Sequence, residues 1–236
     1  MAVVGNFDPL VQAHRQLMER LFLRSRSRSL TSLAIVFHPN PRALLFGPQD
    51  WPIYNDIKAR IAIIRACGVA AVMLIHFTKK DLDLGAEDLF KLVNLHTHLE
   101  EFWLGSRQSL GFGPQGSQNT ITKLAKKQHT QVKFLPPSTA EKDSYFARQA
   151  LASGHVRKAK RLVGFPPIWN RPRSSKIRLP WPPGDYIGVP LDDPLSSNRF
   201  PRIPVRLETA TSTSVTFEWP DRSIEWLAFV KGPGDK

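Results

Sequence analysis

The chain has 236 residues, of which 42% are hydrophobic and 22% are charged. This composition is typical of a folded globular protein and excludes wholesale disorder, and the length allows one large core or one core with a small second unit. No run of about 18 apolar residues is present, so a membrane-spanning helix is not expected. The formal net charge of +13 favours polyanionic partners, whether nucleotide phosphates, nucleic acid or an acidic protein.

The beginning of the sequence predicts a cytoplasmic location. Met1–Gly5 runs directly into an apolar strand, with no basic segment and no cleavage site of a secretory signal. Cys67 is the single cysteine, so no internal disulfide can form, and this fits a reducing compartment.

Short apolar runs alternate with amphipathic segments, which predicts an α/β fold with a parallel sheet. The expected strands are Ala2–Val4, Ser32–Phe37, Ala70–His76, Glu101–Leu104 and Gln131–Phe134. The expected helices are Ala13–Leu23, Asp56–Cys67, Glu87–Leu95, Ile121–Gln128, Asp143–Ser153 and His155–Val163. Asn55 is expected to cap the second helix, and Gly154 and Gly164 to end the last two in the left-handed conformation.

The composition changes after Gly164. Residues 165–201 are rich in proline, which lacks an amide donor, so neither helices nor central strands are expected there. Alternating patterns then predict the strands Ile203–Leu207, Ser214–Trp219 and Ile224–Val230. The sequence therefore predicts two parts, residues 1–164 and residues 165–236, the second being a proline-rich linker with a small β unit.

The most informative segment is Gly5–His14, at the junction of the first strand and the first helix. Free amides of the first helical turn and the helix dipole favour a phosphate group at such a place. Gly5 lets a nucleotide approach the backbone, and His14 can donate a hydrogen bond to phosphate oxygens. The alternative is a plain turn in which Asp8 caps the helix and His14 lies at the surface.

This segment resembles the G-x-F-D-x-x-H-x-G-H motif of the nucleotidyltransferase superfamily, in which two histidines stabilise adenylyl transfer from ATP. Gly5, Phe7, Asp8 and His14 match, whereas Val11 stands in the place of the first histidine. Ala13 likewise stands where the motif has its second glycine.

Four further segments resemble the FAD synthetase family in the same order. Ala34–Leu45 is similar to V-x-F-x-P-H-P-x-x-x-L, with asparagine in place of the histidine, and Leu104–Gly116 is similar to a glycine-rich loop in which Arg107 replaces an acidic or amide residue. Lys142–Arg148 stands where the family has I-S-S-T-x-I-R, and Gln149–Gly164 follows R-x-x-L-x-x-G-x-V-x-x-A-x-x-L-L-G.

The resemblance implies a Rossmann-like nucleotidyltransferase domain that transfers AMP from ATP to FMN, giving FAD and pyrophosphate with the help of Mg²⁺. It implies that His14 and Arg148 act in catalysis. It also implies that nucleotide phosphates are held by a wider set: Gly5, Asn6, Phe7, Asp8, Gly105, Ser144 and Arg148. The sequence assigns no flavin-binding residue and no protein-held metal site.

The departures from the motif indicate impaired catalysis. Val11 removes a transition-state donor, the kind of loss that costs about 10²–10³ in rate, and Arg107 and Tyr145 alter two further positions. The alternatives are a non-catalytic flavin- or nucleotide-binding module with a basic interaction surface, and non-specific nucleic-acid binding. Riboflavin kinase activity is not expected, because the Thr-Ala-Asn run of the kinase barrel in bifunctional members is missing. Trp181–Tyr186 resembles a later segment of that barrel, so residues 165–236 are interpreted as a shortened remnant.

Other candidate residues have ordinary interpretations. His96 and His98 are expected to be surface histidines rather than metal ligands, and Cys67 a small core residue. Three tryptophans are expected to be buried in the β unit rather than to stack on bases or flavin: Trp181, Trp219 and Trp226. Asp192 and Asp193 are expected to be solvated, and the Arg/Ser alternation of Arg24–Ser29 to be a solvated connection, with RNA contact as its alternative.

Overall fold

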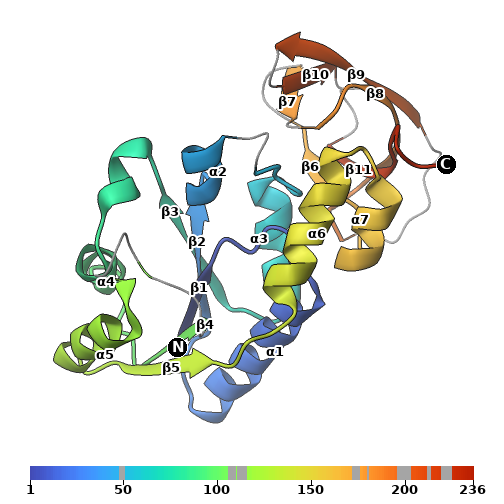
Figure 1. The fold of residues 1–236 in the computed structure, drawn as a ribbon. Coiled ribbons are helices and arrows are strands. Elements are labelled where there is room, and N and C mark those ends of the chain that lie inside the picture. Colours follow the sequence, from blue (N-terminus) through green and yellow to red (C-terminus); the bar gives the residue numbers. More distant parts are fainter. Residues whose placement is uncertain are drawn as a thin grey trace.

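A computed structural model describes residues 1–47, 51–105, 110, 116–171, 176–179, 181–195, 203–211, 214–218 and 225–236. A five-stranded parallel sheet has the order β3-β2-β1-β4-β5 (Figure 1). Its strands are β1 (Ala2–Gly5), β2 (Leu33–His38), β3 (Ala71–His76), β4 (Glu101–Gly105) and β5 (Gln131–Leu135). The predicted α/β class, with a separate small β unit at the C-terminus, is confirmed. Among the described residues, no helix is both long and apolar enough to cross a membrane.

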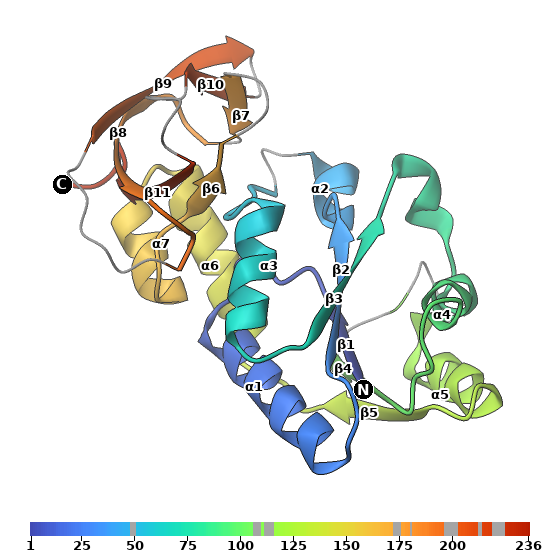
Figure 2. The same ribbon diagram turned by 180° about the vertical axis from the view of Figure 1, so that it is seen from behind.

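Helices cover both faces of the parallel sheet (Figures 1 and 2). α1 (Gln12–Ser27) and α3 (Ile57–Ala66) pack on one face, and α4 (Ala86–Asn94) and α5 (Gln118–Lys127) on the other. α6 (Ala140–Ala152) and α7 (Val156–Val163) follow β5. Gly154 and Gly164 have φ angles of 73° and 96°, so the two predicted left-handed helix ends are confirmed.

Two predictions about helices were wrong. Asn55 does not cap α3, because Asp56 does so by accepting the amide of Ala59 at 2.7 Å. α1 continues to Ser27 through most of the Arg/Ser alternation, where a solvated connection was expected. Arg24 and Arg28 are held there by Glu101, at 2.9 and 2.7 Å, and this anchors the last turns of the helix.

Two short helices were not predicted. α2 (Pro41–Phe46) begins at Asn40, whose side chain accepts the amide of Arg42 at 3.0 Å. Asparagine followed by proline is a recognised start of a helix, so the sequence did contain the signal. η1 (Lys79–Asp83) is a 3₁₀ segment with Asp81 bonded to Thr78.

The C-terminal sheet has six strands in the order β6-β11-β8-β9-β10-β7. They are β6 (Ile168–Asn170), β7 (Lys176–Leu179), β8 (Gly184–Leu191), β9 (Ile203–Thr211), β10 (Ser214–Glu218) and β11 (Trp226–Lys231). The expectation that residues 165–201 hold no central strand was wrong, since β8 pairs on both sides. Pro190 is tolerated because it pairs with Leu227 of β11 only, beyond the end of the β9 pairing at Gly188.

The C-terminal sheet shares a core with α6 and α7. A single cluster of buried side chains contains Leu151 and Val163 from the helices together with Trp181 and Phe229 from the sheet region. The indole of Trp181 contacts the ring of Phe229 edge-on at 4.8 Å between centroids. The packing of buried side chains is therefore continuous across Gly164. The division of the chain into two domains at that residue stays a prediction.

Candidate functional site

In the turn after β1, the ring of Phe7 folds back against Gly5. Phe7 has a φ angle of 48°, and its ring would lie 2.8 Å from a β-carbon placed on Gly5. The lack of a side chain at Gly5 is thus explained by the Phe7 ring, which packs directly against that position. α1 then begins at Gln12, and its N-cap residue Val11 makes no side-chain cap.

Asp8 is buried and turned away from α1. Its carboxylate accepts the main-chain N–H groups of Tyr54 at 3.1 Å and of Asn55 at 3.0 Å. Desolvation raises the pKa of Asp8, although Arg60 and these amides oppose the shift. The alternative in which Asp8 caps the first helix is therefore wrong, and its side chain positions the turn against the segment before α3.

His14 lies in the first turn of α1 and is only partly exposed. Its Nδ1 is 3.1 Å from the carbonyl oxygen of Pro9, and its ring meets Phe7 edge-on. Because a carbonyl only accepts, the neutral ring carries its proton on Nδ1 and leaves Nε2 without one. Desolvation lowers the pKa of His14 to about 4, so this neutral form prevails near pH 7. A phosphate bound at Nε2 would need to recruit a proton to gain a donor there.

Val11 is fully buried at the position of the missing histidine. It belongs to the same core cluster as Ala147 and Leu151 of α6. The side chain therefore serves to pack α6 against the turn, and it leaves no hydrogen-bond donor at this position.

α6 brings Arg148 to the turn, and Ser144 is buried one helical turn before it on the same helix. Arg148 Nη1 donates to the main-chain oxygen of Asp8 at 2.9 Å, and its guanidinium lies 3.9 Å from the ring centroid of Trp51. Desolvation lowers the pKa of Arg148 to about 10, which still leaves it charged near pH 7. The juxtaposition of the Gly5–His14 turn with Arg148, expected from the sequence, is present.

A second buried guanidinium, from Arg60 of α3, was not predicted. Its Nη1 donates to the main-chain oxygen of Asn6 at 2.9 Å, and its Nη2 lies 3.3 Å from Nδ1 of His38. Arg60 lies on the apolar face of α3, between Ile57 and Ile64. An arginine at such a position in the helical pattern is the sequence feature from which its burial could have been predicted. The ring of Trp51 lies between the guanidiniums of Arg42 and Arg148, and no sequence pattern predicted this contact.

Several buried polar atoms around this turn have no hydrogen-bond partner in the described part of the chain. They are Asn6 Oδ1, Asn40 Nδ2, Trp51 Nε1, Asn55 Nδ2, Arg60 Nε and Ser144 Oγ. Leaving such atoms unpaired costs about 1–3 kcal/mol each, so an unpaired group in a native structure calls for an explanation. A polar ligand at the carboxyl edge of the sheet would supply the missing partners, and such an edge is where parallel α/β sheets bind ligands.

The glycine-rich segment after β4 is described only at its ends and at Leu110. Gly105 is the last residue of β4 and pairs with Leu135 of β5, at the same edge of the sheet as Gly5. Arg107 lies outside the described residues.

Comparison with known proteins gives the lineage. The family model of FAD synthetase matches residues 1–146. The chain belongs to the FAD synthetase family. It is 24% identical to the bifunctional riboflavin kinase/FMN adenylyltransferase of Escherichia coli K12 over 69% of its length, and 25% identical to that of Pseudomonas fluorescens over 70%. These matches cover 53% and 54% of the two relatives, so the chain spans about half their length.

A solved structure supports the same fold over the whole chain. The crystal structure of a macrolide-efflux protein from Streptococcus pneumoniae superposes with a TM-score of 0.63, covering 100% of this chain and 86% of that one. At 16% identity the likeness concerns the fold alone.

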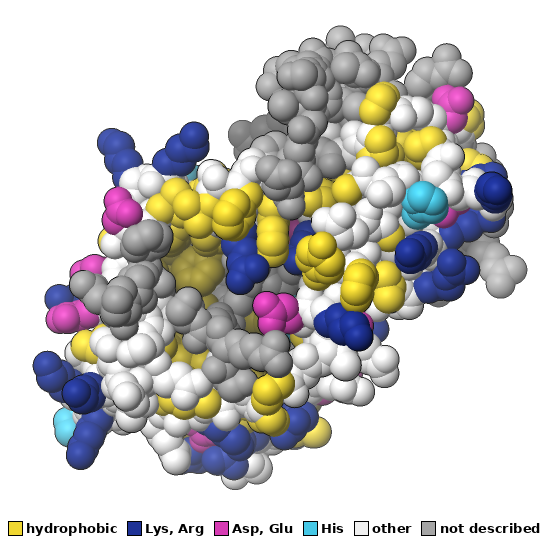
Figure 3. All heavy atoms as spheres, in the orientation of Figure 1, with side chains coloured by type: hydrophobic (Ala, Val, Ile, Leu, Met, Phe, Trp, Pro, Cys, Tyr) yellow, Lys and Arg dark blue, Asp and Glu magenta, His cyan; other side chains and the backbone are white. Residues whose placement is uncertain are grey.

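In this member of the FAD synthetase family, exposed apolar side chains lie on the two helices beside the site. Phe46 of α2 is 58% exposed and Tyr145 of α6 is 50% exposed. Figure 3 shows hydrophobic side chains gathered over both helices. The ring of Phe46 lies 6.5 Å from that of Trp51, which connects this apolar rim to the two guanidiniums.

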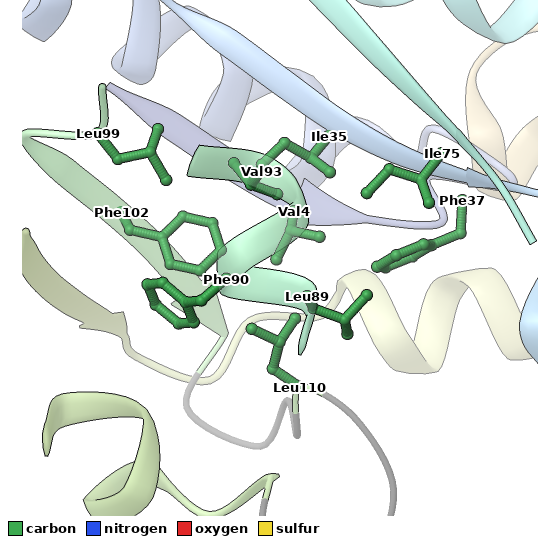
Figure 4. Close-up of a pocket in the computed structure, with 10 residues that line it drawn as sticks. All are labelled: Val4, Ile35, Phe37, Ile75, Leu89, Phe90, Val93, Leu99, Phe102 and Leu110. Atoms are coloured by element: carbon green, nitrogen blue, oxygen red, sulfur yellow. The ribbon is translucent and has the colours of Figure 1, made fainter. Parts of the chain in front are cut away.

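An apolar cavity lies between the sheet and α4, but it is too small for a flavin ring. Figure 4 shows its lining, which includes Phe37, Phe90 and Leu110. The cavity holds about 10 Å³, the space of a single water, and its apolar walls offer that water no partner. It is therefore a packing defect in this conformation.

The remaining candidates have structural explanations. His96 and His98 are exposed, and no three metal-ligating side chains cluster within the described residues. Trp181 is buried and donates to the carbonyl of Ile53 at 3.2 Å, whereas Trp226 is half-buried and Trp219 lies outside the described residues.

Two acidic residues and the cysteine also lie in ordinary environments. Asp192 and Asp193 are exposed, and Asp193 accepts the amide of Leu195 at 2.7 Å. Cys67 is half-buried at the C-terminal end of α3 and lines a pocket there, so it is not a full core residue.

Proposed function

We propose that the protein is an FMN adenylyltransferase with reduced catalytic power. A phosphate oxygen of FMN forms a bond to the α-phosphorus of ATP, and pyrophosphate leaves with the bonding electron pair. His14 and Arg148 act on the phosphates, and the amides of Gly5, Asn6 and Phe7 line their path. Ser144 and Gly105 complete the phosphate contacts, while Asp8 holds the turn in place.

The observation that carries this proposal is a buried excess of positive charge at the carboxyl edge of the sheet. Arg60 and Arg148 are both buried there. Desolvation lowers the pKa of each guanidinium, and among the acids the carboxylate of Asp8 has the largest effect in raising it. Neither guanidinium forms an ion pair within 4.0 Å among the described residues. Asp8 is the one fully buried acid of this group, and Asp56 adds a partly exposed one beside Arg60. Two buried guanidiniums without a direct ion pair favour an anionic ligand, since uncompensated buried charge is costly.

The reduced rate follows from Val11. One preorganised donor to the transition state contributes about 10²–10³ in rate, and a buried valine contributes none. His14 adds to the deficit because its neutral ring offers no proton on Nε2 in the free protein. Arg148, already charged and fixed by Asp8, retains its electrostatic contribution.

Mg²⁺ is proposed to arrive with ATP. Mg²⁺ is commonly held by substrate phosphates, waters and one or two carboxylates. The buried carboxylate of Asp8 is committed to two amides, so the described residues suit phosphates better than a protein-held ion.

The decisive assay incubates the purified protein with FMN, ATP and Mg²⁺ and separates the flavins by chromatography. We expect slow formation of FAD, and a further fall of at least about tenfold in Arg148→Ala. Arg161→Ala, which removes an exposed arginine from α7, is the matched control and should leave the rate unchanged. No FAD above background, or equal rates for the two variants, contradicts the proposal. Riboflavin with ATP should give no FMN.

The second candidate is a binding module without catalysis, favoured by the packed Val11. Such a module would bind ATP or FMN by calorimetry and form no FAD. Its basic surface would be α7, where Arg157, Lys158, Lys160 and Arg161 are all exposed and dark blue side chains gather in Figure 3. Nucleic acid binding there would weaken steeply with salt, whereas the absence of binding at low salt would remove that partner.

A further inference from the structure

A separate pocket of about 430 Å³ lies between α1, α3 and the C-terminal sheet. Its walls are mostly apolar and include Ile63 from α3, Ile168 from β6 and Leu191 from β8. α3 is joined to β6 beside it, since Asp56 donates its amide to the carbonyl of Ile168 at 3.3 Å. Volumes of about 300–1,000 Å³ are typical of small-molecule sites, so this space suits a ligand of modest size.

Two opposite charges stand on one wall of this pocket. Arg15 and Glu19 are one helical turn apart on α1, and both line the space. They form no salt bridge with each other or with another described residue. Glu19 is exposed, and Arg15 has donors besides Nη1, the atom that binds two main-chain carbonyls. Their spacing places a guanidinium and a carboxylate on the same face of the helix.

Arg15 is rigidly held and connected to the candidate site. Its Nη1 donates to the carbonyls of Leu10 at 2.6 Å and of Val163 at 2.8 Å, and its guanidinium lies 5.4 Å from the centroid of Phe165. Leu10 belongs to the turn that precedes His14. A ligand bound to Arg15 would therefore contact the side chain that ties this turn to the end of α7.

We propose that this pocket binds a small apolar zwitterion, such as a free amino acid with a large hydrophobic side chain. Its carboxylate pairs with Arg15, its ammonium group with Glu19, and its side chain lies against the apolar wall. This site is distinct from the nucleotide site and does not depend on adenylyl transfer.

Cys67 provides a direct reporter of occupancy. It lines the pocket, it is half-buried, and it is the only cysteine of the sequence. Alkylation by N-ethylmaleimide therefore labels one position, and a bound ligand should shield it. Burial raises the pKa of Cys67, so the reaction is best followed at a fixed pH near 8.

The test measures the alkylation rate of Cys67 in the whole protein with L-phenylalanine, 3-phenylpropanoate or 2-phenylethylamine. Only the first carries both charges, so we expect it to slow alkylation at concentrations about tenfold lower than either analogue. Equal protection by an analogue, or no protection by phenylalanine in the millimolar range, overturns the proposal.

Two variants separate binding from folding. Glu19→Gln removes the exposed carboxylate and should weaken phenylalanine about two- to fivefold, while Glu100→Gln, elsewhere on the surface, should not. Ala66→Trp places a large side chain at an exposed lining position and should abolish binding by calorimetry. Circular dichroism checks that each variant is folded. Unchanged binding in both Glu19→Gln and Ala66→Trp contradicts the site.

Discussion

The carboxylate of Asp8 accepts the main-chain N–H of Asn55 at 3.0 Å, across 47 positions of sequence. Asn55 in turn accepts the amide of Ile168 through its side-chain oxygen at 2.7 Å. The turn after β1, the segment before α3 and the first strand of the C-terminal sheet are thus held by one continuous set of hydrogen bonds.

Replacement of Asp8 tests the first link of this set. Asp8→Ala leaves two buried amides without an acceptor, and we expect a loss of about 2–4 kcal/mol in the free energy of unfolding. Asp8→Asn keeps one acceptor oxygen and should cost less than half as much. Urea denaturation measures both. Asp83→Ala, at an exposed acid, should change stability by less than about 0.5 kcal/mol, and a similar loss there would contradict the interpretation.

Glu101 anchors the basic end of α1. Desolvation opposes its ionisation, but hydrogen bonds from Arg24, Trp103 and Arg28 prevail and lower the pKa of Glu101 to about 2. Because both arginines are about 40% exposed, we expect Glu101→Gln to destabilise by about 1–3 kcal/mol rather than by the cost of a fully buried pair. Glu87→Gln breaks an exposed pair with Lys91 and is expected to cost less than about 0.5 kcal/mol.

The same carboxylate predicts a dependence on pH. Its folded pKa lies below the ordinary value of 4.5, so its contribution is complete above pH 4.5 and is lost as the pH falls toward 2. The difference in stability between wild type and Glu101→Gln should shrink over this range. A constant difference would show that charge is not responsible.

His14 predicts a loss of stability in the same direction as Glu101, as the pH falls, but at higher pH and from a different cause. Its pKa falls from 6.5 to about 4 because of desolvation, so the unfolded chain binds a proton between these values and the folded chain does not. Stability is therefore complete above pH 6.5 and falls as the pH is lowered to 4, by as much as about 3 kcal/mol. In His14→Gln this loss should disappear from the urea unfolding profile. Persistence of the full loss would assign it to other groups.

Tyr54 tests the contact between the candidate site and the chain after α7. Its hydroxyl donates to the carbonyl of Phe165 at 2.7 Å, and the ring is fully buried. Tyr54→Phe should cost about 1 kcal/mol in thermal or urea unfolding. Tyr145→Phe, the same change at a half-exposed ring, should be neutral, and equal effects would rule out a specific role for the buried hydroxyl.

The parallel sheet was predictable because its strands are short apolar runs between helix patterns. Ala2–Val4 and Gln131–Phe134 each lie within one residue of the observed β1 and β5. β8 was missed because proline was treated as excluding pairing on both edges, whereas Pro190 needs only one edge free. A local sequence pattern identifies a strand, but the lengths of the two neighbouring strands decide whether a proline can be accommodated in it.

The candidate site was predictable only in part. Motif order brought Arg148 to the turn correctly, since it donates to Asp8. The direction of the Asp8 carboxylate, the ring of Phe7 over Gly5 and the burial of Arg60 depend on residues distant in sequence. No spacing rule contains that information, because the partners are fixed by tertiary packing.

The core cluster that joins Val11 to Trp181 and Phe229 has a consequence for how the chain can diverge. A substitution at either aromatic residue changes the packing of the same buried cluster to which Val11 of the turn belongs. Substitutions in this part of the C-terminal sheet are therefore constrained by the packing of the N-terminal turn, whether or not the sheet itself takes part in a reaction.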